Sequence, residues 1–213
     1  CPPMLRYLRT RNSIEETTAA QEFKVADTPL RPSASVDYEP GEGLTVRTGY
    51  RREARDELIP SDEVKPTLDE GYVRVDKTFF PVDRDIKPAV KEWLDKVSCR
   101  VSLDRIPDFF KRDLVLLKTE MRAVLTEQAN AVKVVDTRVV PRVQVRPAEP
   151  GWLDFQVDYA VGGYRVPHDL IRRAKEEYVQ IDDYTWAKVD RKTIAVIEDR
   201  LRELDVEITA EGA

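Results

Sequence analysis

The chain of 213 residues is 41% hydrophobic, 8% aromatic and 35% charged, and its 35 basic and 40 acidic side chains leave a net charge of −5. It is too apolar for a disordered chain and too polar for a membrane protein, and no apolar run reaches the roughly 18 residues of a membrane-spanning helix. The mixed charge provides no overall field that attracts a polyanion, which leaves only a local basic face for nucleic-acid contact.

The two cysteines, Cys1 and Cys99, belong to neither a disulfide framework nor a CxxC pair. This usage suits a reducing cytoplasm and speaks against a zinc site. The first residues lack the apolar stretch of a secretory signal. We therefore expect a cytoplasmic protein, and because the chain begins at Cys1 rather than at a methionine, we expect a segment of a longer one.

Residues 1–43 carry the weakest periodicity and are predicted to be an irregular lead-in. Pro29, Pro32 and Pro40 interrupt this stretch, and proline removes an amide that strand pairing uses. Only residues 36–38 have the character of a strand.

Residues 44–102 are predicted to form a first α+β unit. Alternation of apolar and polar residues predicts four strands that pair as two hairpins: 44–50 with 57–60, and 72–75 with 79–82. Apolar residues at helical spacing predict a helix over 86–97. Asp85 is its expected N-cap, because Pro88 is tolerated only in a first turn.

Residues 103–150 are predicted to connect two units. An apolar stripe that begins at Ile106 predicts one long helix over 105–128. The valine-rich stretch 132–145 is predicted to form two short strands separated by Pro141.

Residues 151–213 are predicted to form a second α+β unit, which has the clearest strand pattern in the chain. Two hairpins are expected here: 153–159 with 164–166 across Gly162-Gly163, and 178–181 with 185–189. A short helix over 167–175 separates them. Asp190 is expected to cap a helix that continues to Leu204, and a last strand is expected to begin at Val206.

The two units match at spaced positions, which indicates an internal repeat, although alternating apolar residues agree to some extent by chance. The matched positions lie before, within and after the second hairpin of each unit: Ser61 with His168, Tyr72 with Tyr178, Phe79 with Trp186, Asp83 with Asp190, and Leu94 with Leu201. The predicted fold class is therefore α+β, with two similar units of antiparallel hairpins plus helix, joined by the long helix.

Few residues of this sequence are candidates for a catalytic site. The only histidine, His168, would have to activate any serine or cysteine nucleophile, but its match with Ser61 indicates an exposed turn residue. Asp182 and Asp183, with Glu177, could bind Mg²⁺ or act as acid and base, but a hairpin tip explains both aspartates. No phosphate-binding loop is present. We predict no catalytic, cofactor-binding or metal-binding residue in this chain.

Paired arginines are the candidates for binding. Arg51 and Arg52 in the first unit, and Arg172 and Arg173 in the second, could contact nucleic-acid phosphates. Acidic residues flank both pairs, so an ordinary solvated surface is the competing interpretation.

The second half of the chain resembles a known family in four motifs: Trp152-Leu-Asp-Phe-Gln-Val, the Gly162-Gly163 turn, Val166-Pro-His-Asp-Leu-Ile, and Tyr178-Val-Gln-Ile-Asp-Asp-Tyr-Thr-Trp. These are similar to motifs of the bacterial SWI/SNF-type helicase-associated domain, and the similarity extends from about Leu44 onward. Tyr184 stands where the family has a glycine. The resemblance implies a non-catalytic region that precedes the two RecA-like lobes of an ATP-dependent DNA translocase, whose motor motifs lie outside this chain.

We therefore expect an accessory or regulatory domain that positions the ATPase motor domain of the same parent chain, duplex nucleic acid or another protein. The parent gene is then expected to encode a phosphate-binding loop soon after Ala213. One alternative is a free-standing nucleic-acid-binding module. A second alternative, from a different class, is a carboxylate-dependent hydrolase that uses Asp182, Asp183 and Glu177.

Overall fold

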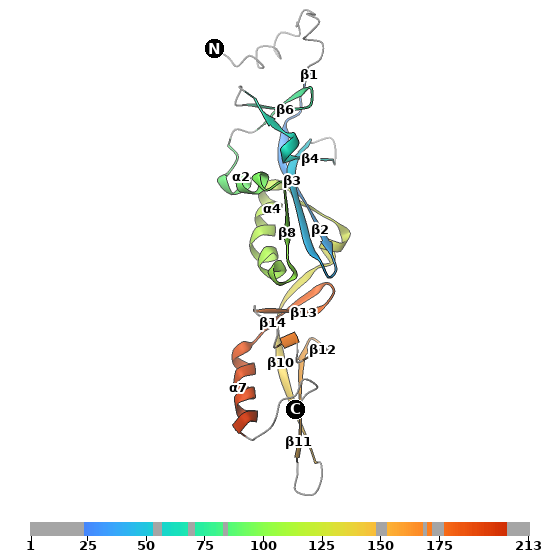
Figure 1. Cartoon of the computed structure of the whole chain (residues 1–213), viewed down its shortest axis with the longest axis vertical. Coiled ribbons are helices and arrows are strands. Elements are labelled where there is room, and N and C mark those ends of the chain that lie inside the picture. The colour runs from blue at the N-terminus through green and yellow to red at the C-terminus, as the bar shows by residue number, and fades with distance from the viewer. Residues whose placement is uncertain are drawn as a thin grey trace, which may run out of the picture. The chain divides into compact units, whose positions relative to one another are not determined.

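The computed structural model describes residues 24–52, 57–67, 71–82, 85–147, 153–167, 170–171 and 177–203. The chain divides into two compact units: Cys1–Ser102 with Asp108–Asn130, and Leu103–Pro107 with Ala131–Ala213. Strands and helices contribute to the fold, which is α+β as predicted (Figure 1). None of the described helices is both long and apolar enough to cross a membrane.

The main sheet of the first unit is built on a long hairpin of β2 (Leu30–Glu39) and β3 (Gly43–Arg52). The register runs from Leu30 opposite Arg52 to Glu39 opposite Gly43. The free edge of β3 pairs with β4 (Leu58–Pro60) and β8 (Ser98–Val101), and β2 pairs in parallel with β9 (Val124–Leu125). The predicted hairpin of 44–50 with 57–60 is confirmed.

The irregular lead-in predicted for residues 1–43 is wrong for residues 24–43, which contain β1 (Lys24–Val25) and β2. Pro32 lies within β2, where it pairs with Tyr50 of β3. Among the described residues, the opposite edge of β2 pairs at Leu30, Ser35 and Val36 but not at Pro32, so the missing proline amide removes no ladder hydrogen bond there. Residues 1–23 lie outside the described part of the chain.

A smaller sheet of the first unit has the strand order β1-β7-β6-β5, from β5 (Lys65–Pro66), β6 (Tyr72–Val75) and β7 (Thr78–Pro81). The predicted hairpin of β6 with β7 is confirmed. A parallel bridge between Leu30 and Val82 links this sheet to β2. Leu30, Val75 and Phe80 form a buried cluster between them.

Helix α2 (Pro88–Asp95) begins after Lys87, so the prediction that Asp85 is its cap is wrong. No side chain caps this end, because Pro88 at the first position already fixes the backbone for the helix and has no amide to satisfy. At the other end, the Thr48 hydroxyl donates to the Trp93 carbonyl at 2.9 Å, and the Ser61 hydroxyl donates to the Leu94 carbonyl at 2.6 Å.

The long helix predicted over 105–128 is wrong. It is divided into η3 (Leu103–Arg105), α3 (Ile106–Asp108), the π-helical turn η4 (Phe109–Asp113) and α4 (Leu114–Met121). Arg122 adopts a φ of 48° and ends α4, because the chain must turn to bring β9 against β2. Helix α4 packs on β2 and does not serve as a connector. A further helix, α5 (Glu127–Ala131), follows β9.

The sheet of the second unit has the order β12-β11-β10-β14-β13. The two short strands predicted over 132–145 are one strand, β10 (Lys133–Pro147), which belongs to the second unit and not to a connection. Its first part runs parallel to β14 (Thr185–Val189), and its second part runs antiparallel to β11 (Leu153–Val161). Pro141 does not break β10, because β11 is the only described strand beside it at that position.

The other local predictions for this unit are confirmed where the structure describes them. Gly162 and Gly163 have φ of 52° and 94° and form the turn into β12 (Tyr164–Val166). Strand β13 (Tyr178–Asp182) pairs with β14, and α7 (Arg191–Glu203) follows. The Thr193 amide donates to the Asp190 carboxylate at 3.2 Å, as an N-cap requires. The strand expected from Val206, and the helix expected over 167–175 except Pro167, Leu170 and Ile171, lie outside the described residues.

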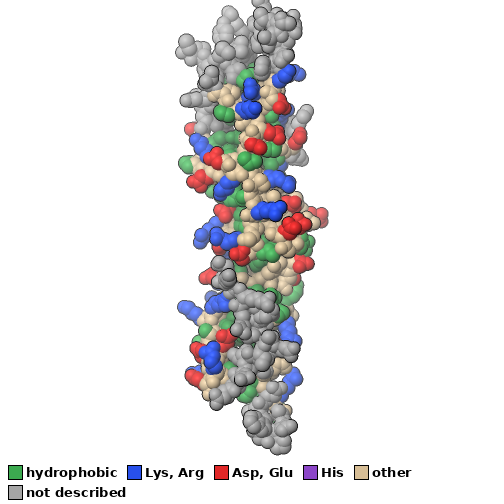
Figure 2. All heavy atoms as spheres, viewed as in Figure 1, with side chains coloured by type: hydrophobic (Ala, Val, Ile, Leu, Met, Phe, Trp, Pro, Cys, Tyr) green, Lys and Arg blue, Asp and Glu red, His purple; other side chains and the backbone are tan. Residues whose placement is uncertain are grey.

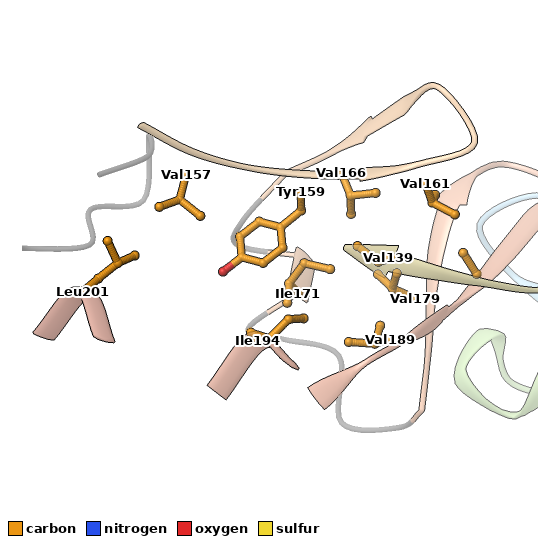
Figure 3. Close-up of a cluster of buried hydrophobic side chains, with 11 residues drawn as sticks. Val139, Val157, Tyr159, Val161, Val166, Ile171, Val179, Val189, Ile194 and Leu201 are labelled. Atoms are coloured by element: carbon orange, nitrogen blue, oxygen red, sulfur yellow. The ribbon is translucent and has the colours of Figure 1, made fainter. Parts of the chain in front are cut away.

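The core of the second unit lies between this sheet and α7. Figure 3 shows the Tyr159 ring beside Ile171, with Ile194 and Leu201 extending from α7 toward the strands. Val139 of β10, which is fully buried, completes the cluster from the middle of the sheet.

The two units share one pairing scheme. In the first, Pro32 lies opposite Tyr50 and Val36 opposite Val46, and in the second, Pro141 lies opposite Tyr159 and Val145 opposite Phe155. The parallel pairs also correspond: Lys24 with Thr78 and Leu30 with Val82 in the first unit, Lys133 with Thr185 and Val139 with Val189 in the second. The correspondence thus includes the strands before each hairpin, and the sheets are mixed where mainly antiparallel sheets were predicted.

Candidate interaction surfaces

The acidic residues considered for catalysis have structural contacts. The Asp182 carboxylate accepts the Tyr184 amide at 2.9 Å, which closes the β13–β14 turn. The Glu177 carboxylate lies 3.6 Å from the Lys188 ammonium group. Asp183 lies beside Asp182 at the same tip. Within the described residues, no group of three or more His, Cys, Asp or Glu side chains could hold a metal ion.

The residues considered as nucleophiles are not assembled into a site by the described part of the chain. His168 lies outside it. Cys99 is half-buried in β8, and burial raises the pKa of its thiol, with Lys96 acting in the opposite direction and Asp113 adding to the rise. A raised pKa disfavours the thiolate, which is the reactive form.

The adjacent arginines Arg51 and Arg52 lie on opposite faces of β3, because neighbouring side chains of a strand alternate. The Arg52 guanidinium stacks over the Phe80 ring at 4.3 Å from its centroid. Phe80 is only 1% exposed, so Arg52 covers the hydrophobic cluster that contains Phe80 and forms a cation–π contact with its ring. Arg51 extends from the other face. Arg172 and Arg173 lie outside the described residues.

Four arginines share the face to which Arg51 belongs. Arg51 lies directly opposite Arg31 of β2, and Arg47 lies two pairs further along β3. Arg100 of β8 pairs with Thr45 and is therefore diagonal to Arg47. We call Arg31, Arg47, Arg51 and Arg100 the basic sheet face. The adjacent arginines 51 and 52 were visible in the sequence. Arg31, Arg47 and Arg100 were missed, because they join this face through strand registers that local sequence does not reveal.

Small residues separate these arginines. Ser33, Ser35, Thr45 and Gly49 lie between them on the same face. A β-carbon at Gly49 would lie 2.0 Å from the Ile59 carbonyl oxygen, so glycine is required for β4 to approach β3. Ser33 is only 3% exposed and Gly49 is buried, so the face is covered at these two positions, and its exposed part lies around Arg47 and Arg100.

The exposed part of the basic sheet face lies around Arg47 and Arg100, whereas Arg31 and Arg51 are half-buried and have interaction partners of their own. Arg47 and Arg100 are exposed, and neither forms an ion pair with a described residue. Asp37 lies opposite Thr45 on this face, and its carboxylate keeps its negative charge, because the Thr126 hydroxyl that donates to it at 2.8 Å is neutral. Figure 2 shows acidic and basic side chains interspersed on the face of the molecule that it draws.

Comparison of the chain with protein-family models, with curated proteins and with solved structures finds no match.

Proposed function

We propose that this chain is a non-catalytic accessory domain that binds the phosphate backbone of duplex nucleic acid through the basic sheet face. The observation that carries this proposal is the gathering of Arg31, Arg47, Arg51 and Arg100 on one face, with Arg47 and Arg100 exposed. Guanidinium groups bind phosphate oxygens by two parallel hydrogen bonds, and such contacts position a protein on a duplex without reading its sequence.

The resemblance to the SWI/SNF-type helicase-associated domain supports a parent protein that is an ATP-dependent DNA translocase. In that setting, the domain holds DNA while it positions the ATPase motor domain of the same chain. The residues of the motifs that carry the resemblance form β11, the Gly162-Gly163 turn and the β13–β14 hairpin. A gene that encodes a phosphate-binding loop after Ala213 is expected, and a gene without a motor domain would favour the free-standing module.

Binding is tested by fluorescence anisotropy of a labelled duplex, titrated with the chain at several salt concentrations. If the two exposed arginines, Arg47 and Arg100, each neutralise one phosphate, the plot of log affinity against log salt has a slope of about −1.8 for B-form DNA. Each of the variants Arg47→Ala and Arg100→Ala should make this slope shallower by about 0.9.

Two control variants distinguish DNA binding by the basic sheet face from a general effect of net charge. Arg202 of α7 pairs with Asp199 at 2.6 Å, so Arg202→Ala makes the same change in net charge and should leave the slope unchanged. Arg52→Met should lower stability and leave the slope unchanged, since Arg52 stacks on Phe80. Binding that is insensitive to salt, or equal losses for Arg47→Ala and Arg202→Ala, would contradict the proposal.

A further inference from the structure

No described element covers one end of the inner face of the second sheet. Val143 and Val145 of β10 are 40% and 53% exposed. They belong to the core face, because Val143 pairs with Val157, which is only 4% exposed, and Val145 pairs with the partly buried Phe155. We call Val143, Val145 and Phe155 the apolar sheet end.

The first unit shows the same sheet positions covered. By the shared register, Ala34, Val36 and Val46 correspond to Val143, Val145 and Phe155, and all three are fully buried. Helix α4 packs on β2, and its Leu114, Leu117 and Met121 side chains are buried. These three residues have the i, i+3, i+7 spacing of one helix face. The cover of this sheet end is therefore a helix that buries one apolar face, formed by Leu114, Leu117 and Met121.

A short strand completes the cover in the first unit. After α4, strand β9 pairs in parallel with β2, with Val124 beside Ser35 and Leu125 beside Val36. The Thr126 amide then donates to the Val36 carbonyl at 3.0 Å. Helix and strand together thus bury the face and the edge of the same sheet segment.

The corresponding edge in the second unit is open among the described strands. Ser35 and Val36 correspond to Gln144 and Val145, and only β11 pairs with β10 there. Pro141 cannot donate an amide hydrogen to β11, so its nitrogen faces the open edge. Val145 lies in phase with Pro141 and directs its backbone amide and carbonyl to the same edge.

We infer that the apolar sheet end is a docking site for a protein partner that presents an apolar helix face followed by a short extended segment. The helix lies on Val143, Val145 and Phe155, and the extended segment pairs in parallel with Gln144 and Val145. The helix excludes water from the exposed valines, and the strand supplies a hydrogen bond to the Val145 carbonyl.

The chain itself provides the probe, a synthetic peptide of residues 109–126, which contains the helix and strand that cover the first unit. Its binding to the full chain is measured by calorimetry or anisotropy. Val145→Asp should weaken binding about tenfold or more, because it sets a carboxylate against an apolar helix face. Val140→Asp is the matched control: Val140 is 44% exposed on the opposite face of β10 and should change the affinity less than about twofold.

Reciprocal peptide variants test the same contact from the other side. Leu117→Asp should abolish binding, because Leu117 is fully buried against the sheet in the first unit. Val115→Asp should not, because Val115 is 55% exposed there. Circular dichroism checks that each variant of the chain is folded, and Val145→Thr, which keeps the shape, replaces Val145→Asp if that variant is not.

Three results would overturn the inference: no saturable binding at about 1 mM peptide, equal losses for Val140→Asp and Val145→Asp, or self-association of the chain that Val145→Asp abolishes. The last would assign the face to a second copy. These outcomes are independent of the nucleic-acid titrations, since the basic sheet face belongs to the first unit.

Discussion

The contact of Thr48 with the end of α2 gives the sharpest test of how the first unit is held together. Thr48 is 1% exposed, and its hydroxyl donates to the Trp93 carbonyl at 2.9 Å and lies 3.3 Å from the Val97 carbonyl. Thr48→Val keeps the shape of the side chain and removes only the hydroxyl. The Trp93 carbonyl near the end of α2 then loses its hydrogen bond from the side chain of β3.

The expected loss follows from the other partners of these carbonyls. The Trp93 carbonyl also accepts the Lys96 amide at 3.2 Å, and the Val97 carbonyl accepts the Thr48 amide at 2.8 Å. Neither carbonyl is left without a donor, so the change costs about 1–1.5 kcal/mol, below the roughly 3 kcal/mol of a fully orphaned buried group.

Equilibrium unfolding in urea, followed by tryptophan fluorescence and circular dichroism, measures this loss. With a denaturant slope of about 1–3 kcal/mol per molar urea, the midpoint of the first unit should fall by about 0.3–1.5 M. The reciprocal variant is Val157→Thr, because Val157 pairs with Val143 as Thr48 pairs with Ala34. Val157 lies in an apolar cluster, so the added hydroxyl should destabilise the second unit by about 1–3 kcal/mol.

An unchanged midpoint for Thr48→Val would refute the view that this hydroxyl secures α2. If Val157→Thr left the stability of the second unit unchanged, both Thr48 and Val157 would stand at positions that tolerate a hydroxyl. The apolar cluster around Val157 would then not exclude a polar group.

Three further measurements test other parts of the fold. Val97 has a φ of 54°, which a β-branched residue adopts at a cost, so Val97→Asn should raise the free energy of unfolding by about 0.5–1 kcal/mol in the same urea assay. The Thr193 amide, and then Arg138, lower the pKa of Asp190 below its usual 3.8. Its contribution to stability is therefore present above that pH and lost below it, and the difference in melting temperature between wild type and Asp190→Asn should shrink as the pH falls below about 4. Burial, reinforced by Glu198, raises the pKa of Tyr159 from 10.0 to about 12, so wild type should lose stability between these pH values, and Tyr159→Phe should lose less. Equal alkaline losses for the two proteins would contradict this assignment.

Local sequence signals were sufficient where neighbouring residues decide the structure. The β6–β7, β11–β12 and β13–β14 hairpins follow from alternation and turn residues, and the Asp190 cap follows from hydrogen bonds within one helical turn. A longer-range signal was present but missed. Lys24-Val-Ala-Asp-Thr matches Lys133-Val-Val-Asp-Thr, and these segments begin the corresponding strands of the two units.

The sequence by itself thus determined the α+β class, the short hairpins and α7, because their hydrogen bonds join residues close in the chain. Tertiary structure decided the rest. Proline-containing β2 is a strand because β3 pairs along its whole length, and α4 ends at Arg122 because β9 must reach β2. The basic sheet face and the apolar sheet end likewise depend on register and cover, which are set by contacts between residues far apart in the chain.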